Sequence, residues 1–257
     1  MTALWVLLLL YGPAELFWLA MVVVAACGLW EFFRLTMSIP TPGLLALQTM
    51  ISILPVAAAL SGRSQFLLPA LFVSLFCLIL LVLARPAEIG KGLHTLGAGS
   101  LGALYIGFCL AHLVLLRFLP QGNGWLLVLT AVTACGDTGA YYIGSTLGRH
   151  KLCPRISPKK TVEGAVGGVV SAVICAVAVG WYLLPRTSPW LIFGAGLLLS
   201  LVSIAGDLAE SVLKRSVGVK DSGTLLGGHG GVLDRIDSLL LAGPVLYYLL
   251  LLAGRLE

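Results

Sequence analysis

The chain has 257 residues, of which 59% are hydrophobic and 11% are charged, and its mean hydropathy is +1.02. A soluble domain of this length does not have such a composition, so we predict an all-α, polytopic integral membrane protein with a single membrane-embedded domain. The net charge of +5 comes from Lys and Arg in short loops, without a basic tail or stripe, which excludes a nucleic-acid partner.

Long apolar runs follow one another along the whole chain. A membrane-spanning helix needs about 20 apolar residues. Eight runs approach or reach this length, and a shorter run precedes them. In chain order the candidates are Leu4–Tyr11, Leu16–Phe33, Leu44–Leu60, Phe66–Ala84, Leu96–Leu116, Trp125–Ile143, Val162–Leu184, Trp190–Ala205 and Ile236–Ala253. The sequence therefore predicts a helical bundle of eight or nine transmembrane helices, and leaves open whether the first run spans the membrane.

Acidic residues are distributed unevenly. Every aspartate lies in the second half of the chain, at positions 137, 207, 221, 234 and 237. We therefore predict that residues 1–120 form a helical scaffold and that residues 121–257 form the catalytic half. Glu15 and Glu31 flank the second predicted span and are interpreted as residues at the membrane interface. The 31 glycines are typical of membrane helices that pack closely.

The cations predict an orientation. With nine spans in alternation, twelve of the 16 Lys and Arg residues fall on one side, and the other side receives Arg63, Arg117, Arg186 and Arg255. Loops rich in Lys and Arg are usually cytoplasmic, so the first side is expected to face the cytoplasm. Both of the charged regions described next fall on that side.

The first charged region is residues 204–239, between two apolar runs. Five polar residues there have the spacing of one helical face: Asp207, Glu210, Ser211, Lys214 and Arg215. Asp234 and Asp237 are one turn apart at the start of the next apolar run, and the Gly-rich stretch 227–231 precedes them. Charged side chains at a membrane boundary are costly, so such a cluster indicates function.

The second charged region is residues 135–168. Asp137 lies late in an apolar span, and Tyr141 is one turn away on the same helical face. The stretch Ser157–Thr161 then leads into the next helix, with Glu163 in its first turn. A hydroxyl-bearing helix start beside two lysines is a good anion site, because free backbone N–H groups and the helix dipole favour negative charge. The alternative is an ordinary cytoplasmic loop with lysines near anionic lipid.

Together these residues favour phosphoryl chemistry. Clustered carboxylates bind Mg²⁺, which prefers a few carboxylates together with substrate phosphate oxygens. Glycines let the backbone approach a phosphate closely, and His229 could donate a hydrogen bond or transfer a proton. A structural network of salt bridges is the alternative, but several charge pairs at a bilayer edge would be a costly way to fix a loop.

Several strings of residues carry a resemblance to a known family. They are Asp137-Thr138-Gly139-Ala140-Tyr141, Ser157-Pro158-x-Lys160-Thr161-x-Glu163-Gly164, Gly206-Asp207-x-x-Glu210-Ser211-x-Leu213-Lys214-Arg215, Lys220-Asp221-x-Gly223 and Gly228-His229-Gly230-Gly231-x-x-Asp234-Arg235-x-Asp237. This pattern resembles the signature of the phosphatidate cytidylyltransferases, or CDP-diacylglycerol synthases. It covers residues 135–238. One departure is Gly227, where many members of that family carry Pro.

The resemblance implies an enzyme of phospholipid biosynthesis that converts CTP and phosphatidate to CDP-diacylglycerol and pyrophosphate. It implies Mg²⁺, with or without a second cation such as K⁺, on Asp207, Asp234 and Asp237, with Lys214 as a further catalytic residue. The substrate-binding residues would be Arg215, Lys220, Asp221, His229, Gly230, Gly231, Arg235, Ser157, Lys160, Thr161, Asp137 and Tyr141. The compact length is similar to that of bacterial members, which implies the inner membrane with the active site facing the cytoplasm.

Two other functions remain as alternatives. A membrane transporter or channel with an intramembrane acidic ion site would also place charges and Gly-broken helices in the bilayer, although the chain has no obvious internal repeat. A CDP-alcohol phosphotransferase would carry a D-G-x-x-A-R pattern, which this sequence lacks. The sequence leaves the oligomeric state open between a monomer and a homodimer.

Overall fold

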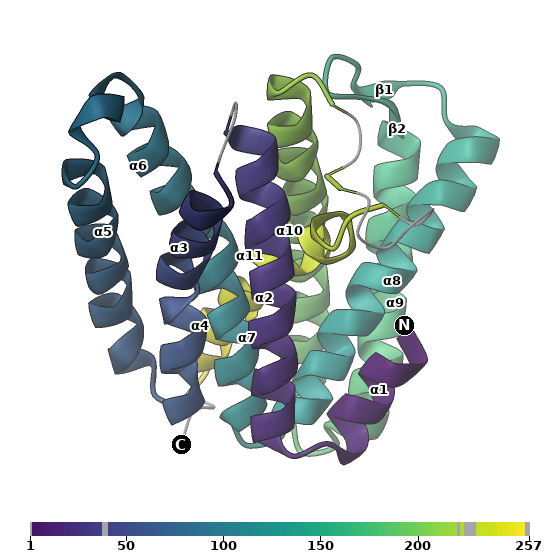
Figure 1. Cartoon of the computed structure of the whole chain (residues 1–257). Helices are drawn as coiled ribbons and strands as arrows, with labels where there is room; N and C mark the ends of the chain where they lie inside the picture. Colours follow the sequence, from purple (N-terminus) through teal and green to yellow (C-terminus); the bar gives the residue numbers. More distant parts are fainter. Residues whose placement is uncertain (1, 38–40, 220–221, 224–229, 255–257) are drawn as a thin grey trace. The chain divides into compact units, whose positions relative to one another are not determined.

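Figure 1 shows a computed structural model of the chain, in which residues 2–37, 41–219, 222–223 and 230–254 are described. In that part of the chain, eight helical stretches are long and apolar enough to cross a membrane. They coincide with the eight longer spans expected from the sequence, so the prediction of a polytopic helical bundle is confirmed. The first helix, Thr2–Tyr11, has 10 residues. At about 1.5 Å per residue it is too short to span the hydrocarbon core.

The chain forms two compact units. The first unit contains residues 1–11, 119–216 and 237–257, and the second contains residues 12–118 and 217–236. The elements of the first unit are α1 (Thr2–Tyr11), α8 (Gly122–Leu147), β1 (Lys151–Cys153), β2 (Ser157–Thr161), α9 (Val162–Leu183), α10 (Pro189–Ser216) and all but the first turn of α11 (Leu233–Leu252).

The second unit consists mainly of the helices that precede α8. Its elements are α2 (Ala14–Thr36), α3 (Pro42–Ser52), α4 (Leu54–Ala58), η1 (Ala59–Ser61), η2 (Ser64–Phe66), α5 (Leu67–Leu83), η3 (Pro86–Lys91), α6 (Gly92–Gly102), η4 (Ala103–Phe108), α7 (Cys109–Phe118) and the first turn of α11. Within this unit α2 packs against α3, α6 and α7, and its buried aromatic side chains Phe32 and Phe33 belong to the core. Glu31 precedes them on the same helix and is also buried.

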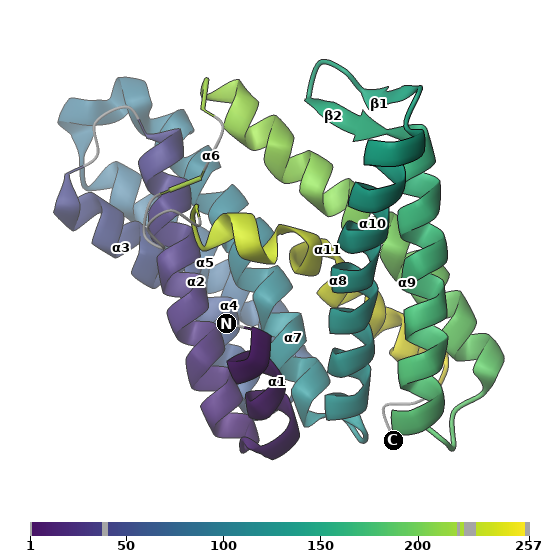
Figure 2. The ribbon, with the colours of Figure 1, turned by 90° about the vertical axis from the view of Figure 1, so that its right-hand side faces the viewer.

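In the first unit, α8 and α9 lie side by side (Figure 2) because both present a small residue at every fourth position. On α8 these residues are Gly136, Ala140 and Gly144, and on α9 they include Gly164 and Gly168. A Cβ atom on Gly168 would lie only 2.8 Å from the carbonyl oxygen of Gly136. Small residues at this spacing let two membrane helices approach at backbone distance.

We expect Gly168→Ala to destabilise the protein. The added methyl group meets backbone and not a flexible side chain, so α8 and α9 must separate, and overpacking of this kind costs about 1–3 kcal/mol. The matched control is Gly194→Ala on α10, where a Cβ atom would meet nothing within 4 Å. Thermal unfolding in detergent should show a lower apparent Tm for Gly168→Ala and an unchanged or higher one for the control. Equal Tm values would contradict the close packing of α8 and α9.

The structure adds one feature that the sequence did not predict. Residues 151–161 form an antiparallel hairpin, with Lys151 opposite Thr161 and Cys153 opposite Ser157, where the sequence indicated a loop. Helix α10 continues beyond the end of the apolar run at Ala205, without a break, to Ser216, which agrees with the helical spacing of residues 207–215. The charged residues 207–215 are therefore carried on the extension of a membrane-spanning helix, which fixes their directions relative to α8 and α9.

Candidate active site

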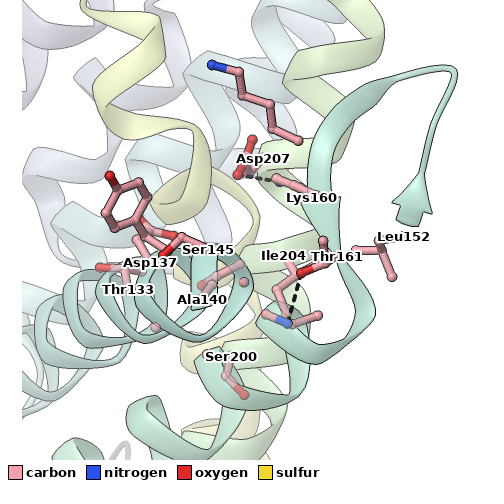
Figure 3. Close-up of a pocket in the computed structure, with 18 of the residues that line it drawn as sticks. Thr133, Asp137, Ala140, Ser145, Leu152, Lys160, Thr161, Ser200, Ile204 and Asp207 are labelled. Atoms are coloured by element: carbon pink, nitrogen blue, oxygen red, sulfur yellow. Dashed lines mark hydrogen bonds and ion pairs between the residues drawn. The ribbon is translucent and has the colours of Figure 1, made fainter. Parts of the chain in front are cut away.

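A cavity of about 430 Å³ opens within the first unit, between α8, α9, α10 and the hairpin (Figure 3). Small and apolar residues form much of its wall. Its charged lining residues come from three elements and are Asp137 on α8, Lys159 and Lys160 on β2, and Asp207 on α10. The two charged regions of the sequence therefore meet at one cavity.

Asp207 and Lys160 form the closest charged contact in this cavity. The Nζ atom of Lys160 makes an ion pair with Oδ2 of Asp207, as Figure 3 shows, and both side chains remain partly exposed. Asp137 lies close enough for its charge to interact with both. Three charged groups from α8, β2 and α10 thus share one polar region, although their chain positions are far apart.

Asp237 belongs to the same unit and extends this group of charges. Its carbonyl oxygen would lie 2.8 Å from a Cβ atom on Gly206, so α10 and α11 approach closely beside Asp207. The Asp237 carboxylate accepts a hydrogen bond of 2.6 Å from the backbone N–H of Ser238. It lies within electrostatic range of Asp207 and Asp137. Asp137, Asp207 and Asp237 are referred to below as the aspartate cluster.

The hairpin that carries the lysines is fixed at both of its ends. Thr161 ends β2 and caps α9, because its Oγ1 accepts a hydrogen bond of 3.1 Å from the backbone N–H of Gly164. Glu163 accepts hydrogen bonds from the backbone N–H of Arg149 at 3.0 Å and from Nδ1 of His150 at 2.6 Å. The predicted hydroxyl-bearing start of the helix is therefore present, and Glu163 holds the hairpin.

The last turns of α10 contain a buried ion pair. Glu210 is fully buried, and its Oε2 accepts a hydrogen bond of 2.6 Å from Nζ of Lys214, one turn further along the helix. Arg215 is exposed on the same terminal turn. A lysine held in this way presents its charge at a fixed place near the end of the helix.

Asp234 has a different environment in the second unit. Its carboxylate accepts hydrogen bonds from the backbone N–H groups of Ser222, at 3.1 Å, and Gly231, at 2.9 Å. Gly230 adopts the left-handed conformation, with φ of +79°, which favours glycine. Asp234 therefore organises the backbone that leads into α11.

Comparison with known proteins now identifies the family. The sequence model of the cytidylyltransferase family matches residues 1–253. The chain belongs to the cytidylyltransferase family. This membership decides in favour of an enzyme, a nucleotidyltransferase, over the transporter or channel that the sequence left open.

Among three relatives that are similar to this chain, two are named phosphatidate cytidylyltransferase and one is an uncharacterized protein. A Bacillus subtilis protein named phosphatidate cytidylyltransferase is 45% identical over 60% of this chain and 57% of its own length. A Synechocystis protein of the same name is 39% identical over 70% of this chain and 69% of its own length. The uncharacterized protein YnbB of Escherichia coli K12 is 39% identical over 76% of this chain and 67% of its own length.

The aspartate side chains at the cavity can be compared with the ligands that a hard cation prefers. Among the described residues, no three His, Cys, Asp or Glu side chains are already gathered closely enough to hold a metal ion. The aspartates of the cluster come from α8, α10 and α11 in one unit and lie within electrostatic range of one another. Carboxylates completed by phosphate and water oxygens are the ligands that Mg²⁺ prefers, so the residues present fit this ion.

The predicted site residues fall into three groups in the structure. Asp137, Tyr141, Lys160, Thr161 and Asp207 line the cavity. Several others are not part of that lining: Ser157, Lys214, Arg215, Gly230, Gly231, Asp234, Arg235 and Asp237. Lys220, Asp221 and His229 lie outside the described residues.

Sequence reasoning missed two groups of residues. Ser203 and Ser200 line the cavity, one and two turns before Asp207 respectively. Their spacing of three and four residues within an apolar span was the signal that could have identified them. Glu31 is the other miss. It was expected at the membrane interface, and the structure shows that its side chain is buried within the protein, only 3% exposed.

Proposed function

We propose that this chain is a phosphatidate cytidylyltransferase, which converts CTP and phosphatidate to CDP-diacylglycerol and pyrophosphate. The observation that carries the proposal is the cavity, where carboxylates and lysines lie against small, largely apolar walls inside a membrane helix bundle. Such a site suits a substrate with an anionic head and an apolar tail together with a polyphosphate. Family membership and the names of the relatives support the same reaction.

In the proposed reaction an oxygen of the phosphatidate phosphate attacks the α-phosphorus of CTP. A new phosphorus–oxygen bond forms there as the bond to the β-phosphate bridging oxygen breaks, and pyrophosphate leaves. The attacking phosphate is already ionised, so no general base is required. Lys159 and Lys160 offset the negative charge of the two substrates at the cavity.

The carboxylates would hold the cation. Asp207 and Asp237, with Asp137 or Asp234, are the residues that would bind Mg²⁺, with or without a second cation such as K⁺. The ion supplies charge neutralisation on the phosphates during an in-line displacement. Lys214, Arg215 and Arg235 are proposed to hold phosphate oxygens, as are Lys220 and His229. Asp221 is proposed as a further substrate-binding residue.

The proposed location is the bacterial inner membrane, with the site facing the cytoplasm. The uneven distribution of Lys and Arg supports this orientation. Phosphatidate would enter from the leaflet and CTP from water. All residues that line the cavity lie between positions 132 and 207, which supports assigning the chemistry to residues 121–257.

We expect purified protein in detergent to release pyrophosphate only when CTP, phosphatidate and Mg²⁺ are all present. Chelation with EDTA should lower release to the background rate, and excess Mg²⁺ should restore it, because the carboxylates cannot neutralise the phosphates themselves. Mg²⁺ should also raise the apparent Tm of the parent protein, since a ligand that binds only the folded state stabilises it.

Omitting each component of the assay tests a different part of the proposal. Release that continues without phosphatidate would indicate hydrolysis of CTP and contradict the proposed transfer. Full activity in EDTA would remove the proposed metal. Consumption of CDP-diacylglycerol in place of CTP would indicate a CDP-alcohol phosphotransferase.

A further inference from the structure

Glu31 is a buried carboxylate far from the signature region in the sequence. It lies on α2, an apolar helix, and is 3% exposed beside the buried Phe32 and Phe33. Burying a carboxylate is costly unless its oxygens receive hydrogen bonds. The hydrogen bonds that offset this cost therefore indicate what the Glu31 carboxylate does.

Those contacts are with Ser222 and Leu233, which lie between the signature residues near the start of α11, within the second unit. Oε2 of Glu31 accepts a hydrogen bond of 3.0 Å from the backbone N–H of Leu233, the first residue of α11. The hydroxyl of Ser222 also donates to this oxygen, at 3.5 Å. One carboxylate from the N-terminal half thus binds two points of the C-terminal signature.

Two signature glycines enclose the same carboxylate. A Cβ atom on Gly223 would lie 2.6 Å from Oε1 of Glu31, and one on Gly231 would lie 2.6 Å from Oε2. Real side chains do not approach this closely, so both positions require glycine in this arrangement. The sequence attributed Gly231 to close approach of a phosphate. The structure shows that it makes room for Glu31 and Ser222.

Glu31 and Asp234 act on one short stretch of chain. Asp234 accepts hydrogen bonds from the backbone N–H groups of Ser222 and Gly231, while Glu31 binds the Ser222 hydroxyl and the Leu233 N–H. Two carboxylates on different helices therefore fix the entry to α11. Asp237 lies one turn after Asp234 on that helix, so the entry also sets the helical phase of Asp237.

One oxygen of Glu31 remains unsatisfied. Oε1 is buried and receives no hydrogen bond from the described residues. Leaving a buried acceptor unpaired costs stability, so packing alone does not explain a carboxylate here. We propose that Glu31 is a positioning residue for the cytidylyl transfer. Its carboxylate holds Ser222, Gly231 and the first turn of α11 in the arrangement that the reaction requires. This inference rests on the proposed function.

The test is Glu31→Gln, which keeps the size of the side chain and an oxygen that can accept from Leu233 but removes the charge. We expect kcat to fall by about 30-fold, because misplacement of reacting groups lowers turnover strongly. The KM values for CTP and phosphatidate should change by less than about threefold, and the apparent Tm in detergent should stay close to that of the parent. The matched control is Glu15→Gln, an exposed glutamate on the same helix, which should leave all these values unchanged.

A second readout does not depend on turnover. In Glu31→Ala, amide hydrogens of peptides that contain Gly231 and Leu233 should exchange at least about tenfold faster than in the parent, because their fixing contact is gone. Exchange that stays unchanged would overturn the contact. A kcat for Glu31→Gln within about threefold of the parent, or a loss that matches the unfolded fraction, would overturn the positioning role.

Failure of the proposed function would look different. In that case the parent protein itself would release no pyrophosphate from CTP and phosphatidate. The role of Glu31 in that transfer would then be overturned too, while the exchange measurement would still decide whether Glu31 holds the entry to α11.

Discussion

Asp207→Asn is expected to lower turnover by at least about 1000-fold, because in the proposed reaction several kcal/mol of transition-state stabilisation depend on the carboxylates that would hold the cation. Asp207 is the member of the aspartate cluster that both lines the cavity and pairs with Lys160. Asn has nearly the same shape, so the packing of α10 should survive. Pyrophosphate release in detergent measures the effect, and thermal unfolding shows whether the fold is intact.

The control for this substitution is Glu88→Gln. Glu88 is an exposed acid of the second unit that pairs with Arg85 at 3.2 Å, and an exposed pair of this kind contributes at most about 1 kcal/mol. Its loss should leave turnover unchanged. Mg²⁺ should raise the apparent Tm of the control but not that of Asp207→Asn. If Asp207→Asn kept more than about a tenth of parental turnover, the assignment of this carboxylate to the cation would be wrong.

The membrane spans could be predicted from sequence because each depends on local composition. A run of apolar residues long enough to cross the bilayer is visible without knowledge of its neighbours, and the eight longer runs all form helices. The hairpin could not be predicted in this way. Its strands have three and five residues, and they are held by pairing with each other and by Glu163, which lies outside both.

Part of the candidate site was also visible in the sequence. Asp137 and Tyr141 were placed on one helical face by their spacing of four residues, and both line the cavity. The contacts of Glu31 could not be predicted from the sequence, for a physical reason. A single Glu near the end of an apolar run has the pattern of an interfacial residue, and only the tertiary structure brings it against Gly223 and Gly231.

Lys160→Met is expected to lower turnover by about 100-fold, an effect typical of removing one group that stabilises developing charge in a phosphoryl transfer. The ammonium group of Lys160 pairs with Asp207 and lies within electrostatic range of Asp137. Without it, the carboxylates repel one another and the incoming phosphates. Lys160→Arg keeps the charge on a different shape and should retain more activity than Lys160→Met.

The matched control for Lys160 is Lys151→Met on the neighbouring strand. Lys151 is exposed and does not line the cavity, although it belongs to the same hairpin. A cation that merely attracts anionic lipid contributes about 1 kcal/mol wherever it lies on the membrane surface. If both lysines acted in that way, the two substitutions would lower turnover equally. A loss confined to Lys160 would instead assign the effect to its position in the cavity, beside Asp207, and equal losses would refute that assignment.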